Sequence, residues 1–213
     1  LKRGVDIVVA TPGRLLDLMR RHALSLEGIH TVVLDEADEM LNMGFSEDLK
    51  AILSEIPEER NLLLFSATMS REIATIAHSY LHNPKEITIG RKNEANSNIR
   101  HIYYLVPARQ RYLALKRIVD FYPSIYGIVF CRTRVETKEI AEHLIADGYN
   151  ADALHGDLSQ EQRDRVMQRF RSGHLQLLVA TDVAARGLDV DNLTHVIHYG
   201  LLDDVENYTH RSG

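Results

Sequence analysis

The stretch VVLDEADEML, Val32 to Leu41, runs from an apolar strand directly into a group of acids. Asp35 and Glu36 are adjacent, and Asp38 follows closely. Adjacent carboxylates repel each other unless a positive charge lies nearby, and a magnesium ion that carries a nucleoside triphosphate supplies such a charge. One carboxylate can hold the ion, directly or through water, while the other orients and activates an attacking water. An isolated Asp-Glu pair is by default a solvated loop, but the apolar run before this pair favours the magnesium interpretation.

Similar apolar runs recur along the chain and alternate with stretches that carry apolar residues at helical spacing. Near-continuous apolar strands separated by helices are typical of parallel sheets covered on both faces, so we predict an α/β fold. The predicted strands are Val5–Ala10, Thr31–Asp35, Leu62–Phe65, Glu86–Ile89, Ile102–Val106, Gly127–Cys131, Ala151–Leu154, Leu175–Ala180 and Thr194–His198. Capping boxes predict that two helices start after Thr133, with Glu136, and after Ser159, with Gln162.

The stretch GRKNEANSN, Gly90 to Asn98, has no apolar residue except Ala95. Its composition is typical of a linker, and it separates two halves that are each large enough for one α/β sheet. We therefore predict a first lobe at residues 1–89, a linker at 90–98 and a second lobe at 99–213.

The two halves share a faint repeat. IVVATPGRL, Ile7 to Leu15, and LLVATDVAARGL, Leu177 to Leu188, both place Ala-Thr at the end of an apolar strand, before a turn into a helix. A threonine hydroxyl and free backbone N–H groups at such a turn provide a seat for phosphate. Two such phosphate-binding sites, one in each lobe, could bind one continuous phosphate backbone.

The bulk composition limits the possible classes of protein. With 45% hydrophobic residues among 213, the chain can form one large domain or two small ones with real cores. The formal net charge of -5 disfavours a general polycation, although a local basic stripe is enough for nucleic-acid contacts. Cys131, the only cysteine, is expected as a small buried hydrophobe and fits a cytoplasmic location. No apolar run approaches the ~20 residues of a membrane helix, so no membrane partner is expected.

Further motifs accompany the acids. Leu-Phe-Ser-Ala-Thr, Leu64 to Thr68, ends the next strand, and ATDVAARGLD spans Ala180 to Asp189. With the Asp-Glu-Ala-Asp tetrad, these motifs make the chain resemble a DEAD-box RNA helicase of superfamily two, over essentially all 213 residues. The resemblance implies two RecA-like lobes, the first incomplete, with ATP and Mg²⁺ as cofactors. It also implies local unwinding of RNA duplexes or remodelling of RNA–protein complexes, with RNA held through phosphate and sugar and little sequence preference.

The resemblance assigns roles to individual residues of the first lobe. Asp35 is implied to hold Mg²⁺ through water, and the motif of Ser66 and Thr68 to couple nucleotide state to strand separation. Both hydroxyls can hydrogen-bond carboxylates from the neighbouring strand. The implied catalytic residues of this lobe are Asp35, Glu36, Asp38, Ser66 and Thr68. The implied RNA contacts are Thr11, Pro12, Gly13 and Arg14, which also match a helix that opens with proline.

In the second lobe, the resemblance implies contacts to both RNA and nucleotide. The implied RNA contacts are Arg132, His155, Gly156, Gln160, Arg163, Thr181 and Gly187. Asp189 is implied to lie near the nucleotide ribose, and Arg186, at the face between the lobes, is also expected to bind the cofactor. His210 and Arg211 begin the last family motif, which meets the nucleotide, and are implied to be catalytic.

Two parts of the family pattern do not occur in the sequence. No lysine follows a glycine, and the last motif stops at Gly213, before its two further arginines. We therefore expect a sequence truncated at both ends, with the phosphate loop before Leu1 and the arginine fingers after Gly213. Because an arginine finger alone is worth ~10³–10⁵ in rate, the 213 residues by themselves are expected not to hydrolyse ATP usefully.

Two alternative functions stay open. A DNA helicase would use adjacent acids for magnesium in the same way, and only the resemblance favours RNA. A non-catalytic RNA-binding clamp or interaction scaffold would keep the lobes and leave the acids vestigial. For a helicase, Gly90–Asn98 is the expected hinge on which the lobes close around ATP and RNA.

Overall fold

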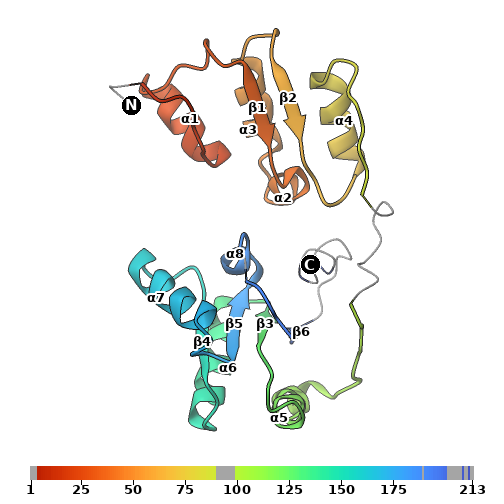
Figure 1. The fold of residues 1–213 in the computed structure, drawn as a ribbon, viewed down its shortest axis with the longest axis vertical. Helices are drawn as coiled ribbons and strands as arrows, with labels where there is room; N and C mark the ends of the chain where they lie inside the picture. Colours follow the sequence, from red (N-terminus) through yellow and green to blue (C-terminus); the bar gives the residue numbers. More distant parts are fainter. Residues whose placement is uncertain (1–3, 90–98, 189, 201–207, 209–210, 212–213) are drawn as a thin grey trace. The chain divides into compact units, whose positions relative to one another are not determined.

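The computed structural model describes residues 4–89, 99–188, 190–200, 208 and 211 (Figure 1). The chain forms two compact units, residues 1–94 and residues 95–213. The expected hinge Gly90–Asn98 lies outside the described residues, so the linker and the limits of the two lobes stay predictions.

The first unit contains a small parallel sheet. Strands β1, Thr31–Leu34, and β2, Asn61–Leu64, pair in parallel along their whole length. The helices are α1, Pro12–Arg20, α2, Ala37–Asn42, α3, Ser46–Ser54, and α4, Arg71–Tyr80. Leu34 at the end of β1 is buried in one core with Leu53 of α3 and Ile73 of α4. This packing fixes the point from which the acid motif leaves the sheet.

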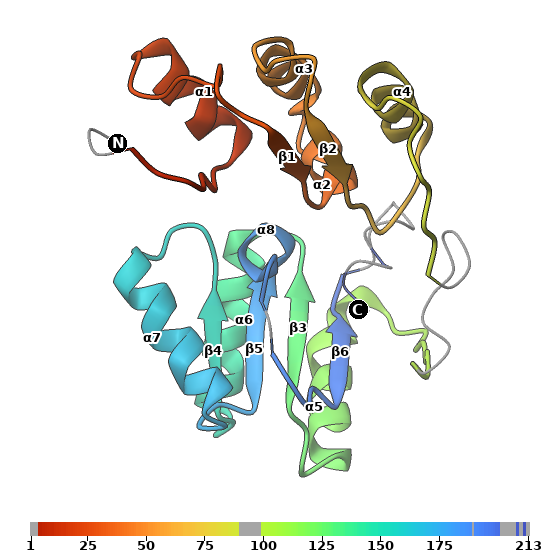
Figure 2. The same cartoon turned by 45° about the horizontal axis from the view of Figure 1, so that its top comes forward.

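The second unit contains a four-stranded parallel sheet in the order β4-β5-β3-β6. Its strands are β3, Gly127–Cys131, β4, Ala151–Leu154, β5, Leu177–Thr181, and β6, His195–His198. Its helices are α5, Arg111–Phe121, α6, Arg134–Ala146, α7, Gln160–Arg171, and α8, Asp182–Ala185, with a short 3₁₀ helix at Ala108–Gln110. Figure 2 shows all four strands pointing toward the same edge of the sheet.

Helices cover both faces of this sheet. Alternate residues of β3 belong to two cores: Val129 packs with residues of α5 and α6, and Phe130 packs with residues of α7. All five residues of β3 are buried, which explains why its sequence is apolar without alternation. The predicted α/β fold with parallel sheets is confirmed. Within the described ranges, every helix is too short or too polar to span a lipid bilayer.

Three of the predicted strands are wrong. Val5–Ala10, Glu86–Ile89 and Ile102–Val106 have no strand structure, and most of their apolar side chains face solvent, with Val9 94% and Ile89 95% exposed. A strand needs a neighbour that takes up its backbone hydrogen bonds, and none of the described strands pairs with these segments. The composition of these three segments therefore reflects a propensity for strand structure, but the segments have no strand to pair with among the described residues.

The predicted helix starts are confirmed. Ser159 forms a full capping box with Gln162, since each side chain accepts a hydrogen bond from the other residue's backbone N–H. Thr133 accepts from the N–H of Glu136 at 3.1 Å. The Glu136 carboxylate accepts from the N–H of Arg132, one residue before the cap. Both bonds fix the direction in which the chain leaves the strand.

We expect Ser159→Ala to destabilise α7 by about 1 kcal/mol, because the N–H of Gln162 loses its acceptor at the start of the helix. Hydrogen exchange of α7 peptides, followed by mass spectrometry, measures this free energy of opening. Ser172→Ala is the matched control, since it removes a hydroxyl from the other end of α7. Equal effects of the two variants would contradict the capping role.

Candidate functional site

The acid motif forms a tight turn between β1 and α2. Asp35 and Glu36 are both exposed, and the carboxylate of Asp35 accepts from the N–H of Glu36 at 3.0 Å. Glu36 has φ 51° and ψ 48°, a left-handed conformation that is uncommon for a residue other than glycine. Such conformations cluster at functional sites, where the surrounding structure holds them. The turn therefore presents two carboxylates to solvent at the carboxyl end of a parallel strand.

Asp38 differs from its two neighbours because it is only 2% exposed. One carboxylate oxygen accepts from both the N–H and the hydroxyl of Thr68, at 2.7 and 2.9 Å. The other oxygen accepts from the N–H of Glu39 at 3.1 Å. A buried charge is tolerated when it is satisfied in this way. The buried carboxylate of Asp38 therefore ties the acid motif to Thr68.

Ser66 adds a second bond between the two motifs. Its hydroxyl accepts from the N–H of Asp38 at 3.3 Å and donates to the carbonyl of Thr68 at 2.7 Å. Thr68 bonds a carboxylate as predicted, although Asp38 lies on α2 and not on the neighbouring strand β1. Ser66 bonds the backbone N–H of Asp38 in place of the predicted carboxylate. The catalytic roles of all these residues stay predictions.

The exposed pair of acids suits a magnesium ion that arrives with a nucleotide. Among the described residues, no group of three or more His, Cys, Asp or Glu side chains forms a dedicated metal cluster. Mg²⁺ in proteins commonly keeps several waters and uses one or two carboxylates together with phosphate oxygens. The hard oxygen donors of Asp35 and Glu36 at the end of β1 fit that requirement.

The predicted RNA contacts of the first unit lie at the start of α1. Thr11 has an extended backbone, and Pro12 is buried as the first residue of the helix. Proline is favoured there because its missing N–H would have had no partner within the helix. Gly13 is exposed, and Arg14 forms an ion pair of 2.8 Å with Asp17 on the same helix.

Predicted RNA contacts of the second unit gather at the carboxyl edge of its sheet. Arg132 follows β3 and is exposed, Thr181 ends β5, and His155 with Gly156 follows β4. His155 is buried, and its Nδ1 accepts from the N–H of Asp157 at 3.4 Å. Because β4, β5 and β3 are neighbours, the sheet brings these strand ends together.

Four further predicted residues lie on α7 or directly after α8. Gln160 begins α7 and donates to Asp164 at 2.7 Å, while Arg163 donates to the carbonyl of Ala184 at 3.3 Å and so joins α7 to α8. Gly187 has φ +67°, a backbone conformation that L side chains rarely adopt. Arg186 is half-buried beside it. Asp189 and His210 lie outside the described residues.

Arg211, predicted to be catalytic, has partners that the sequence did not indicate. Its side chain is 2% exposed and lies over the ring of Phe130, with 4.9 Å from Cζ to the ring centroid. Its Nη2 donates to the carboxylate of Asp182 at 2.7 Å, and its Nε donates to the other oxygen of the same group. Its Nη1 lies 3.3 Å from Nδ1 of His198. The only sequence signal for the pair of Arg211 and Asp182 was the position of Asp182, an acid just past the end of a predicted strand.

His198 is neutral in this environment. Burial, and next to it the positive charge of Arg211, lower the pKa of His198 from 6.5 to about 4. Because a guanidinium can only donate, Nδ1 of His198 must accept, which places the ring proton on Nε2. The ring of Tyr208 stacks on His198 at 4.7 Å between centroids.

We expect acid to destabilise the second unit through His198. Its pKa is about 4 when folded and 6.5 when unfolded, so between these values the unfolded chain binds a proton that the folded chain does not. The free energy of unfolding of the second unit is therefore unaffected by His198 above pH 6.5. Between pH 6.5 and about 4 it falls by up to about 1.4 kcal/mol per pH unit. Hydrogen exchange of β6 peptides between pH 7.5 and 5, corrected for intrinsic rates, measures this loss. A His198→Gln variant with the same pH dependence would contradict this prediction.

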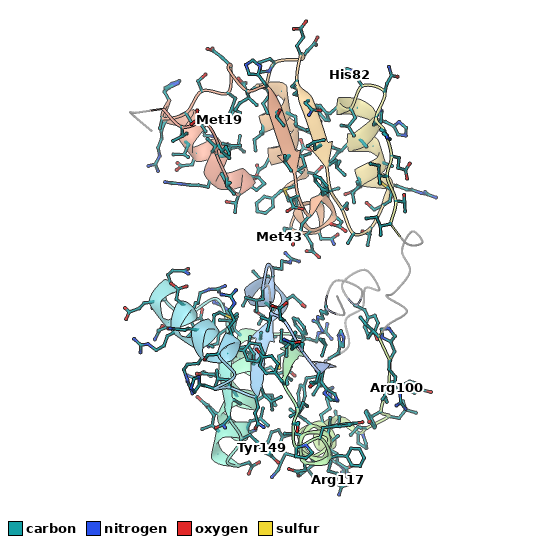
Figure 3. All side chains as sticks on the ribbon, viewed as in Figure 1. Met19, Met43, His82, Arg100, Arg117 and Tyr149 are labelled. Atoms are coloured by element: carbon teal, nitrogen blue, oxygen red, sulfur yellow. The ribbon has the colours of Figure 1, made fainter. Side chains whose placement is uncertain are left out.

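Two tyrosines with raised pKa values, Tyr112 and Tyr149, lie in a different part of the second unit. Tyr149, labelled in Figure 3, precedes β4 at the amino edge of the sheet and donates to Asp120 at 2.5 Å. This bond, more than burial, raises the pKa of Tyr149 to about 12. Tyr112 donates to Asp147 at 2.6 Å and its pKa is also raised, chiefly by burial. These bonds join α5 to the segment between α6 and β4, away from the carboxyl ends of the strands.

Both units match helicase family models. Residues 1–76 match the family model described as DEAD/DEAH box helicase, and residues 110–213 match the model described as helicase conserved C-terminal domain. The DEAD-box ATP-dependent RNA helicase CshA of Geobacillus kaustophilus is 46% identical over 213 residues, which are 100% of this chain and 46% of that protein. CshA of Bacillus subtilis is 45% identical over 100% of this chain and 43% of its own length. The chain thus spans less than half the length of these curated relatives.

Solved structures agree with the family models. The structure of S. cerevisiae Dbp5 bound to RNA and ADP BeF3 matches with a TM-score of 0.85 and 31% identity, over 96% of this chain and 54% of that chain. A DEAD box protein from the hyperthermophile Methanococcus jannaschii matches with a TM-score of 0.53 and 44% identity, over 97% of this chain and 56% of that chain. The predicted RecA-like fold class is thereby confirmed.

Proposed function

The chain belongs to the DEAD-box helicase family, and on this premise we propose that it is the core of an ATP-dependent RNA helicase. The activity would locally unwind RNA duplexes or remodel RNA–protein complexes. The observation that carries the proposal is the bonded link between the exposed acids and Thr68, made through buried Asp38. Through this link, a nucleotide bound at Asp35 and Glu36 could change the position of Thr68 at the end of the neighbouring strand.

The first unit supplies the residues for ATP hydrolysis. Mg²⁺, when bound, neutralises charge that develops on the phosphate oxygens, and Asp35 would hold it through water. A carboxylate oxygen of Glu36 would orient the attacking water and accept its proton. Asp38 stays bonded to Thr68 and so anchors the start of α2, directly after the turn that carries both exposed carboxylates.

The second unit supplies phosphate contacts for RNA. Arg132 is a cation at an exposed strand end, Thr181 offers a hydroxyl at the next strand end, and Gly156 leaves room for a close backbone approach. Contacts of this kind bind phosphate and sugar and read little sequence. The similar structure of S. cerevisiae Dbp5 was solved with bound RNA, and this supports RNA as the partner of this chain. Buried Cys131 supports a reducing compartment, and we include the cytoplasm in the proposal.

Strand displacement from a short RNA duplex by the full-length protein tests this function. We expect ATP to accelerate displacement, and we expect ADP or omission of Mg²⁺ to abolish the acceleration. A DNA duplex of the same sequence is the matched control for the nature of the partner.

Three outcomes would overturn the proposal. Equal displacement of RNA and DNA duplexes would favour a helicase without RNA specificity. Tight RNA binding with no effect of ATP on displacement or affinity would favour a non-catalytic clamp. No binding of single-stranded RNA at low salt would remove RNA as the partner altogether.

A further inference from the structure

All three guanidinium nitrogens of Arg211 donate within the second unit. Nε and Nη2 donate to the carboxylate of Asp182, and Nη1 lies 3.3 Å from His198 Nδ1 and 3.4 Å from the carbonyl of Gly200. The side chain is 2% exposed and stacks over Phe130. A fork–fork pair of this kind fixes direction as well as distance. Arg211 would have to leave these partners before it could touch a nucleotide.

The partners of Arg211 come from three adjacent strand ends. Asp182 directly follows Thr181 at the end of β5, Gly200 lies two residues after β6, and Phe130 is the penultimate residue of β3. In the sheet, β5 and β6 both pair with β3. One side chain therefore ties together the carboxyl ends of three neighbouring strands.

Gly200 connects this side chain to Arg132. A Cβ atom at Gly200 would lie 3.0 Å from Cγ and 3.1 Å from Cδ of Arg132, which is tighter than ordinary van der Waals contact. The stem of Arg132 thus lies against the backbone of Gly200, whose carbonyl accepts from Arg211. A shift of Arg211 would move the surface on which Arg132 lies.

We propose that Arg211 is a positioning residue for RNA binding, which holds Thr181 and Arg132 at a fixed separation from within the sheet. This inference rests on the proposed RNA-binding function and replaces the nucleotide contact that the resemblance implies for Arg211. A phosphate backbone has a fixed repeat, so two contacts reach it together only when their separation matches. The pairing of β3 with β5 fixes the backbone at these two contacts, and Arg211 sets the placement of their side chains without touching the RNA itself.

Arg211→Lys in the full-length protein tests the inference, because lysine keeps the charge and loses the planar fork. We expect the Kd for single-stranded RNA to rise roughly tenfold, with a salt slope reduced by about 0.7 for one lost phosphate contact. The KM for ATP at saturating RNA is expected to stay unchanged. Arg169→Ala is the matched control, since Arg169 pairs with Asp152 at 2.8 Å on the exposed side of α7.

A double-mutant cycle with Asp182→Asn shows whether the effect acts through the pair. We expect Asp182→Asn to weaken RNA binding alone and to add nothing in the Arg211→Lys background. Should Arg211→Lys fail to fold, Gly200→Ala tests the same geometry, because it pushes on Arg132 directly. Its effect on RNA affinity is expected to vanish in the Arg132→Ala background.

Several results would overturn the inference while the proposed function stands. A raised KM for ATP with unchanged RNA affinity would make Arg211 a nucleotide contact. Unchanged values of both, or additive effects of Arg211→Lys and Asp182→Asn, would leave it without a positioning role. If the unaltered protein itself fails to bind RNA, the proposed function fails first, and this outcome is distinguishable from the others.

Discussion

Glu36→Gln in the full-length protein is expected to bind ATP with unchanged affinity and to lose RNA-stimulated hydrolysis by about 10²–10⁴-fold. Glutamine keeps the shape of the side chain but cannot accept a proton from the attacking water. Glu36 is exposed at the end of β1, and its carboxylate is free of the buried contacts that hold Asp38. The variant therefore removes a chemical group without disturbing the core around it.

Steady-state ATP turnover at saturating RNA, together with binding of a fluorescent ATP analogue, separates the two effects. Glu27→Gln is the matched control, because Glu27 is an exposed glutamate in the loop before β1. A parallel loss of nucleotide affinity and turnover would make Glu36 a binding residue and contradict its assigned role.

Asp38→Asn is expected to destabilise the first unit by about 1–3 kcal/mol and to loosen the contact with Thr68. Both carboxylate oxygens of Asp38 accept from backbone N–H groups, one from Thr68 and one from Glu39. An amide has only one oxygen, so its NH₂ group must face one of these donors. Because the site is buried, water cannot replace the lost acceptor.

Hydrogen exchange of peptides that contain residues 37–42 and 66–70 measures this loss. We expect faster exchange in both peptides, since one carboxylate joins them. Asp6→Asn, an exposed aspartate of the same unit, is the matched control. Faster exchange in only one of the two peptides would show that Asp38 does not couple the motifs.

The sequence carried enough information to place the central strands, because burial on both faces leaves a plain apolar signal. Gly127–Cys131 and Ala151–Leu154 were predicted with the bounds that the structure shows. Val5–Ala10 is also largely apolar and forms no strand, since composition does not reveal whether a neighbour is available for pairing. Hydrogen-bond partners across a sheet depend on the tertiary fold, which a run of residues does not contain.

The acid motif and its link to Thr68 were also foreseeable, because consecutive strands of a parallel sheet end at the same edge. The environment of Arg211 was not. Its partner Asp182 lies 29 residues earlier in the chain, and the chemistry of an arginine fits a phosphate as well as a carboxylate. Only the fold shows that the carboxylate satisfies the side chain. The left-handed conformation of Glu36 had no signal either, because glutamate does not favour it.

The most direct test of the central claim is the ATP turnover of the full-length protein, titrated with a single-stranded RNA and with a DNA strand of the same sequence. We expect turnover to rise with RNA to a plateau, to stay near its basal rate with DNA, and to remain flat with both strands in Glu36→Gln. Turnover that ignores nucleic acid, or that rises equally with DNA, would contradict an RNA-dependent ATPase built on Asp35 and Glu36.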